Sequence, residues 1–513
     1  MTAKRLVIAC ALALLGAAGP AAAVVKYWDH GGTDDRWSNP TNWSGNTVIA
    51  SNDNPTVRNT ECPDSPQTIL LDMDAFITFF SITATNNRHV TINSDNGSAL
   101  IFSNGNGLYG VRGVDVTIHS AIKISSSGLT IDRSDRRVTL NGNIGPAPGS
   151  GVPFLSPKSG GVLTLAGSNN LSYVLNNGAG EVVVKSPHAL GNGYFKALDD
   201  GCTLSIATNA RLYGDLLCPT AAGSSLNLRI TDAGTNDVTL IVDGDCNVGE
   251  RITILTNANG STGRFLCRLR STGSYTVRWD AQTNTTLSFE GGASWGDATG
   301  KGIVSGGCAV AIDNGGATTK LYAACAYTGG TTIRSGTLLL QDHNRLPTND
   351  VLTIESAGYL SLYAKSQSLA TLAGSGTVLF STTSAYGTNW VTGLFSPGSG
   401  PGTMTFTSPG RLILGPACIS RFELGALAGA SDKAVFGSSY SHVTLDGTLS
   451  VVNLGGLEPG SYTLVDMTGG TIAGNFSRID MPRGFLGSIQ TASGDVVLTV
   501  TRIKGPGAVL MVK

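Results

Sequence analysis

The sequence predicts an all-β protein assembled from many short strands. Charged residues make up 13% of the 513 residues, against about 25% in typical soluble domains. The chain has 68 glycines, which is nearly twice the usual share of ~7%. Short Val, Leu and Ile runs alternate with Gly, Ser, Thr and Asn, as in strands separated by turns. No long segment after the first 25 residues shows a convincing helical apolar period.

The first expected element is an export signal at residues 1–23. Lys4 and Arg5 form a positive start, Leu6 to Leu15 form an apolar segment, and Ala21 to Ala23 form a small-residue cleavage site. We therefore expect a mature chain that begins at Val24. A lipoprotein signal at Cys10 is the alternative, but the apolar stretch before Cys10 is too short for a signal core.

An aromatic cap is expected at residues 24–59. It contains Trp28, Trp37 and Trp43 among Asn and Asp residues, and the pattern resembles the leader that follows the signal in many exported repeat proteins. The end of a solenoid exposes an apolar cross-section, which bulky aromatic side chains would cover. The alternative is that exposed tryptophans stack on sugar rings.

A solenoid is expected at residues 60–384, because short apolar runs recur there between turns. The strands expected there include Thr68 to Leu71, His89 to Ile92, Val114 to Ile118, Leu129 to Ile131, Val162 to Ala166, Val238 to Val242, Ile252 to Leu255 and Val304 to Ala311. An array of β-sandwiches would give similar glycine-punctuated strands. The choice between these architectures depends on one motif.

That motif is YTGGTTIRSGTL, from Tyr327 to Leu338, followed by the strand-like VLTIESAGYLSLY from Val351 to Tyr363. β-Branched residues favour a pleated strand, and the flanking glycines give turns access to positive φ. The motif residues are Tyr327, Thr328, Gly329, Gly330, Thr331, Thr332, Ile333, Gly336, Thr337 and Leu338.

With Leu346 and the GSGTVLF of Gly374 to Phe380, this stretch resembles the autotransporter-associated β-strand repeat. The resemblance implies a right-handed parallel β-helix, exported and then displayed or released outside the cell. It implies no catalytic residues. The repeat-like segment covers residues 323–380, and a weaker copy lies near residues 162–206, where Gly180 aligns with Gly336 and Val182 with Leu338. The alternative is that any two glycine-punctuated strand pairs would align similarly.

A C-terminal β module is expected at residues 393–500, followed by a tail at 501–513. Its strands and the LDGTL of Leu445 to Leu449 resemble the C-terminal module of the same class of proteins, and they form either final coils or a sandwich-like cap. Roughly 100 residues are too few to form this module together with an outer-membrane β-barrel. We therefore expect a protein that carries the autotransporter-associated repeat but not the outer-membrane β-barrel of autotransporters.

Removal of the signal would leave an even number of cysteines, which favours disulfides in an oxidising compartment. Cys202 with Cys218 and Cys246 with Cys267 are the candidate pairs close in sequence. Buried, unpaired thiols on the inner face are the alternative. No CxxC pair suggests a zinc or redox site. The cysteines are Cys62, Cys202, Cys218, Cys246, Cys267, Cys308, Cys325 and Cys418.

No catalytic, metal or cofactor site is expected. The histidines lack metal-ligand spacing, and no nucleophile elbow, HExxH or P-loop motif occurs. A set of four aspartates could bind calcium. It could also place acids near Arg229 or Arg251, as in a polysaccharide lyase. Asx turns explain the same aspartates more simply. The set comprises Asp232, Asp237, Asp243 and Asp245.

Two functions remain as hypotheses. The first is a non-enzymatic extracellular or cell-surface solenoid with a structural, matrix or adhesion role; a periplasmic location is also compatible. The second is a carbohydrate-active β-helix enzyme resembling a polysaccharide lyase. Extracellular glycans and self-association are the expected partners. A net charge of −1 without a basic block argues against nucleic acid, and no later apolar run is long enough for a membrane helix.

Overall fold

The computed structural model is almost entirely β-strand. It describes residues 24–50, 53–58, 66–83, 89–103, 107–112, 114–125, 127–231, 237–246, 249–255, 264–271, 274–281, 284–292, 294–296, 301–380, 387–398, 400–427, 431–492 and 494–503. A 3-10 turn at Pro40–Asn42 is the one helical element among them. The expected signal, Cys62 and Asp232 lie outside the described residues. The chain divides into two compact units, Met1–Ser172 and Tyr173–Lys513.

The first unit consists of three parallel strand ladders. One contains β1 (Val25–Trp28), β2 (Asn54–Arg58), β5 (Phe80–Thr83), β8 (Leu108–Arg112), β11 (Gly128–Asp132) and β14 (Phe154–Lys158). The second contains β3 (Gln67–Leu71), β6 (His89–Ser94), β9 (Asp115–Ile118), β12 (Arg137–Leu140) and β15 (Val162–Leu165). The third contains β4 (Ala75–Ile77), β7 (Ala99–Phe102), β10 (Ala121–Ile124) and β13 (Ile144–Pro146).

The second unit also contains three strand ladders. One contains β16 (Tyr173–Asn176), β18 (Tyr194–Ala197) and β21 (Leu216–Leu217). Another contains β17 (Glu181–Val184), β19 (Thr203–Ile206), β22 (Ser225–Ile230), β24 (Arg251–Leu255), β27 (Arg278–Ala281), β30 (Val304–Gly306) and β32 (Ala326–Tyr327). Every strand pair with a described register in these two ladders is parallel.

The largest ladder of the second unit runs to its C-terminal end. It contains β20 (Ala210–Leu212), β23 (Val238–Val242), β25 (Phe265–Leu269), β26 (Ser274–Tyr275), β28 (Thr285–Phe289), β29 (Ser294–Trp295), β31 (Ala309–Leu321), β33 (Thr331–Leu340), β34 (Val351–Ser361), β35 (Ser368–Gly374), β36 (Thr377–Leu379), β37 (Thr388–Pro397), β38 (Thr403–Thr407), β39 (Gly410–Leu414), β40 (Ile419–Leu424), β41 (Lys433–Phe436), β42 (Ser441–Leu445), β43 (Thr448–Asn453), β44 (Gly460–Met467), β45 (Thr471–Gly474), β46 (Arg478–Asp480), β47 (Phe485–Ala492) and β48 (Asp495–Arg502). Its last two strands form an antiparallel hairpin.

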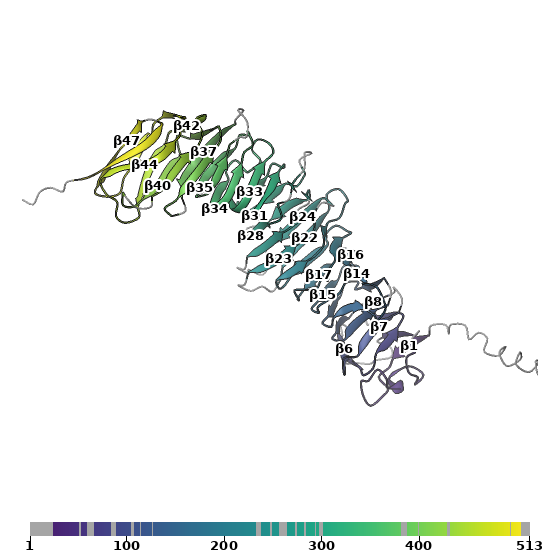
Figure 1. Ribbon diagram of the computed structural model, residues 1–513. Coiled ribbons are helices and arrows are strands. Elements are labelled where there is room, and N and C mark those ends of the chain that lie inside the picture. The colour runs from purple at the N-terminus through teal and green to yellow at the C-terminus, as the bar shows by residue number, and fades with distance from the viewer. Residues whose placement is uncertain are drawn as a thin grey trace, which may run out of the picture. The chain divides into compact units, whose positions relative to one another are not determined.

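The predicted β-solenoid is confirmed. Figure 1 shows β31, β33, β34, β35 and β37 as successive neighbouring strands of the second unit. Side chains alternate between the interior and solvent along each strand, as the period of two requires. In the first unit, the inward positions of the second ladder align in register and are 0–1% exposed; they are Ile69, Ile92, Ile118, Leu140 and Leu165. We call each turn of the chain around this core a coil.

Asx side chains at the corners link each coil to the next. The side chain of Asp115 accepts a hydrogen bond from the backbone N of Arg137 at 2.9 Å. Asn209 does the same for Thr239 at 2.9 Å, and Asn389 for Gln367 at 2.9 Å. These bonds satisfy backbone N–H groups at or next to the starts of strands β12, β23 and β35, so these Asn and Asp residues help to stabilise the stacking of coils.

The aromatic cap of the first unit is a packed cluster. Trp28, Trp37 and Trp43 are 0–1% exposed. The ring of Trp43 meets that of Trp28 edge-on at 5.0 Å and that of Trp37 at 4.8 Å, and its Nε1 donates to the carbonyl of Trp37 at 2.9 Å. The three rings are therefore buried against one another and offer no free face to a sugar.

The expected disulfides are wrong for the cysteines that the structure describes. None of the described cysteines forms a disulfide, and all of them are buried: Cys202, Cys218, Cys246, Cys267, Cys308, Cys325 and Cys418. Cys267 shows the reason, because it occupies an inward position of β25 between Leu240 and Leu287 of the neighbouring strands. Its thiol packs as a small apolar group, and burial raises its pKa to about 12.

No helix among the described residues is long and apolar enough to cross a membrane.

Candidate ligand-binding groove

An outward-facing groove lies on the large ladder of the second unit. Arg211 of β20, Ile241 of β23, Arg268 of β25 and Ser288 of β28 are aligned in register across four adjacent strands. Their strand neighbours Ala210, Leu240, Cys267 and Leu287 are buried. Because side chains alternate along a strand, this row points away from the core.

A second row lies two residues further along the chain, directly after the ends of the same strands. It contains Tyr213, Asp243, Arg270 and Glu290, and ion pairs connect the two rows. Arg211 Nε donates to Asp243 Oδ2 at 2.6 Å. Arg268 Nε donates to Glu290 Oε1 at 2.5 Å, and Arg270 Nε donates to Glu290 Oε2 at 3.1 Å. Three guanidinium groups thus surround two carboxylates, which leaves an excess of positive charge.

The groove is a hollow of about 310 Å³. This volume falls at the lower end of the range for small-molecule sites. The Arg211 and Arg268 side chains are 41% and 35% exposed, so both guanidinium groups reach solvent at the hollow. The hollow is lined by Pro187, His188, Asn209, Ala210, Arg211, Thr239, Ile241 and Arg268.

Aromatic stacking and ion pairing hold the arginines in place. The Arg211 guanidinium lies 4.6 Å from the centre of the Tyr213 ring, and the His188 ring stacks on the same tyrosine at 6.5 Å. The hydrogen bond to Asp243 raises the pKa of Arg211 above its ordinary value. Each guanidinium bonds to its carboxylate through Nε, which leaves its terminal Nη groups to bind an anion.

The repeat motif lies elsewhere in the second unit, where two of its side chains form buried hydrogen bonds. Tyr327 and Thr331 are 1% exposed, and their hydroxyl groups are 2.5 Å apart. Thr331 also donates to Asp350 Oδ2. Gly330, just before β33, and Gly336, inside β33, have φ of +87° and +73°, a conformation that glycine adopts without steric cost. The motif residues pack and turn the chain and do not line the groove.

The aspartates singled out in the sequence do not form a metal cluster. Asp237 pairs with Arg264 at 2.9 Å, Asp243 belongs to the groove, and Asp245 accepts from the Ser271 hydroxyl. No group of three or more potential metal ligands occurs within the described residues. Arg251 lies in a different ladder, where it pairs with Asp280 at 3.5 Å, so the structure does not bring it to these acids.

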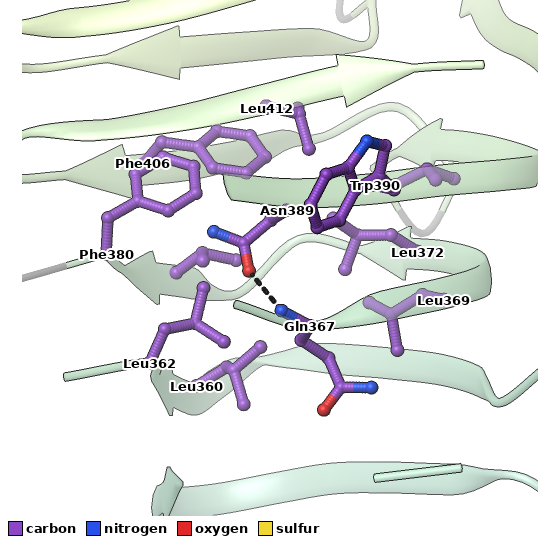
Figure 2. Close-up of a pocket in the computed structure, with 12 residues that line it drawn as sticks. Leu360, Leu362, Gln367, Leu369, Leu372, Phe380, Asn389, Trp390, Phe406 and Leu412 are labelled. Carbon is purple, nitrogen blue, oxygen red and sulfur yellow. Dashed lines mark hydrogen bonds between the residues drawn. The ribbon is translucent and has the colours of Figure 1, made fainter. Parts of the chain in front are cut away.

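A second hollow lies inside the core between β34 and β39 (Figure 2). Apolar side chains such as Leu360, Phe380 and Phe406 surround it, and Asn389 bonds to the backbone N of Gln367 at 2.9 Å. Its volume of about 10 Å³ would hold little more than one water molecule. It is a packing defect of the interior rather than a ligand site.

No protein-family model, curated protein or solved structure gives a significant match to this chain. The groove therefore has to be interpreted from its own chemistry.

Sequence reasoning missed the groove. Arg268 and Arg270 show the one local signal, since arginines two positions apart in a strand share an outward face. Their alignment with Arg211 depends on the register between coils, which loops of variable length obscure in the sequence.

Proposed function

We propose that the protein is an exported, non-enzymatic β-solenoid that serves as a structural, matrix or adhesion component. The observation that carries this proposal is the register of the inward ladders. In the second unit, one inward row continues through six strands with no polar member: Leu338, Leu360, Val378, Phe406, Phe436 and Met467. Such a core supplies length and stability by repetition.

The acidic groups of the described residues support binding over catalysis. Burial raises the pKa of Asp350 and Asp432 to about 6, but both lie in the interior. Asp432 accepts from the backbone N of Glu423 at 2.8 Å and of Gly402 at 3.1 Å. Beside the groove, Asp243 and Glu290 are each ion-paired with an arginine, so both carboxylates are engaged by guanidinium groups.

Export is supported by the charge and apolar pattern of residues 1–23 and by the resemblance of Tyr327 to Leu338 to a repeat of exported proteins. The lack of a disulfide among the described cysteines does not weaken the proposal, because the inward ladders stabilise the coils without covalent links.

Cell fractionation tests the proposed function. Cells producing the full chain should carry protein that added protease and antibody reach on intact cells or in the shed matrix. A chain with Leu12→Glu and Leu14→Glu should stay inside the cell, because the apolar segment of the signal is interrupted. Recovery of the unaltered chain only from the cytoplasmic fraction would overturn the proposal.

A polysaccharide lyase is the second candidate, and the cluster of His188, Tyr213 and Arg211 favours it. An arginine would neutralise a uronate carboxylate while tyrosine or histidine moves a proton. Incubation with acidic glycans, followed by absorbance of unsaturated products, tests this candidate. Absence of product across the panel, with and without calcium, excludes it.

A further inference from the structure

We propose that the groove between β20 and β25 binds an acidic polysaccharide, with the carboxylates of its uronate residues held by Arg211 and Arg268. The inference rests on the proposed extracellular role, and it adds the site and the ligand class. Guanidinium groups bind carboxylates through paired, charge-assisted hydrogen bonds, for which lysine is a poorer substitute.

The spacing of the strands places the two arginines on either side of the hollow. Arg211 and Arg268 are separated by one strand, whose in-register residue is Ile241. Neighbouring strands lie about 4.8 Å apart, so the two arginine backbones are about 10 Å apart. The hollow of about 310 Å³ lies between these two cations. Its size and position suit one uronate ring together with the adjoining sugar unit of the polysaccharide.

The remaining lining groups suit a sugar rather than a simple anion. Ile241 and Pro187 offer an apolar floor for the C–H face of a ring. Thr239, His188 and Asn209 offer hydroxyl, imidazole and amide groups to ring hydroxyls. Asn209 Oδ1 accepts from the backbone N of Thr239 at 2.9 Å, which fixes the amide and leaves its Nδ2 group to donate.

The same residues disfavour nucleic acid. Asp243 and Glu290 offset two of the three positive charges beside the hollow, so charge alone gives a polyanion little affinity and the sugar-binding groups of the lining have to contribute. Base stacking needs an open aromatic face. The Tyr213 ring is already engaged by Arg211 and His188.

Titration calorimetry of the mature chain with a panel of defined probes tests the proposal. The acidic probes are oligogalacturonate, oligoalginate and hyaluronan oligomers. The comparison probes are a neutral cello-oligosaccharide, polyphosphate and single-stranded DNA. We expect at least one acidic glycan to bind, with affinity that falls as salt rises, and the comparison probes to bind at least tenfold more weakly.

Variants connect the binding to the groove. Arg211→Gln and Arg268→Gln should each weaken the acidic glycan about tenfold, because each removes one charge-assisted contact, and the double variant should abolish binding. Arg211→Lys should recover only part of the loss. Arg421→Gln is the matched control, since Arg421 is a 44% exposed strand arginine paired with Glu423 at 2.7 Å. Thermal unfolding of each variant checks that the fold is retained.

Three results would overturn the proposal: no acidic glycan binds, neutral or phosphate polymers bind as tightly, or the two arginine variants bind like the Arg421→Gln control. The outcome is separable from that of the proposed function. Unsaturated product lost in Arg211→Gln would refute the non-enzymatic role while supporting the uronate site. Binding without retention at the cell surface would refute the matrix role alone.

Discussion

At the scale of single residues, Asp350 beside the repeat motif should make the stability of the fold depend on pH. It is 3% exposed, accepts from the Thr331 hydroxyl, and has its Oδ1 buried without a hydrogen-bond partner among the described residues. Burial raises its pKa from 3.8 to about 6. Since the folded pKa lies above the unfolded value, the folded state prefers the protonated carboxyl.

The sign of the pH dependence follows from this shift. The stabilisation by protonated Asp350 is complete below the unfolded pKa of 3.8 and is lost as pH rises through the folded value of about 6. Asp350→Asn has no charge to bury at any pH. Relative to the unaltered chain, this variant should gain up to ~3 kcal/mol in free energy of unfolding between pH 4 and pH 7.5.

Urea denaturation at the two pH values measures this difference. Asp135→Asn serves as control, because the Asp135 side chain is 78% exposed. A constant difference between Asp350→Asn and the unaltered chain at both pH values would refute the assignment.

The inward and outward positions of the motif's strands were largely predictable from the sequence. The buried hydrogen bond between Thr331 and Asp350 was not. The inward positions of Leu352, Ile354 and Leu360 follow from strand alternation, and all three are buried. Asp350 lies between the two strand-like runs, directly before Val351. Its burial against Thr331 depends on how the loop folds over the coil, which no local pattern specifies.

At the scale of elements, the pairing of β33 with β34 and of β34 with β35 defines how coils stack. Thr332 lies beside Thr353, and Thr353 lies beside Ala373. Neighbouring positions in a parallel pair are about 4.8 Å apart, within the Cα separation that a disulfide bridges. Thr332→Cys with Thr353→Cys should therefore cross-link under mild oxidation, as measured by peptide mass spectrometry.

The matched control is Thr332→Cys with Ala373→Cys. These positions are two strands apart, about 10 Å, which exceeds the reach of a disulfide. The buried native thiols should not compete, because their raised pKa values keep them protonated. Equal cross-linking of both pairs, or of neither, would contradict the register.

Strands were predictable from the sequence, but their neighbours across coils were not. The apolar runs Thr68 to Leu71 and Val238 to Val242 fall within β3 and β23. Corner loops vary in length, so the sequence does not say which residue of one coil meets which residue of the next. This accounts for both the missed groove and the wrong disulfides, since Arg211 and Cys267 acquire their neighbours through register alone.

At the scale of the whole molecule, stability should be local. Each coil contacts mainly its immediate neighbours, so the free energy approximates a sum of coil and interface contributions. The β1–β2 pairing in the first unit and the β33–β34 pairing in the second should therefore contribute separately to the free energy of unfolding. A core substitution should therefore weaken its own coils and spare distant ones.

Hydrogen–deuterium exchange of Leu338→Ala tests this central claim most directly. Leu338 is fully buried between Thr319 and Leu360 of the adjacent strands, and its truncation should cost about 2–5 kcal/mol. We predict lost amide protection in β31, β33 and β34, with protection in residues 24–172 unchanged. Uniform loss of protection across both units would show a single cooperative core and would contradict a stacked solenoid.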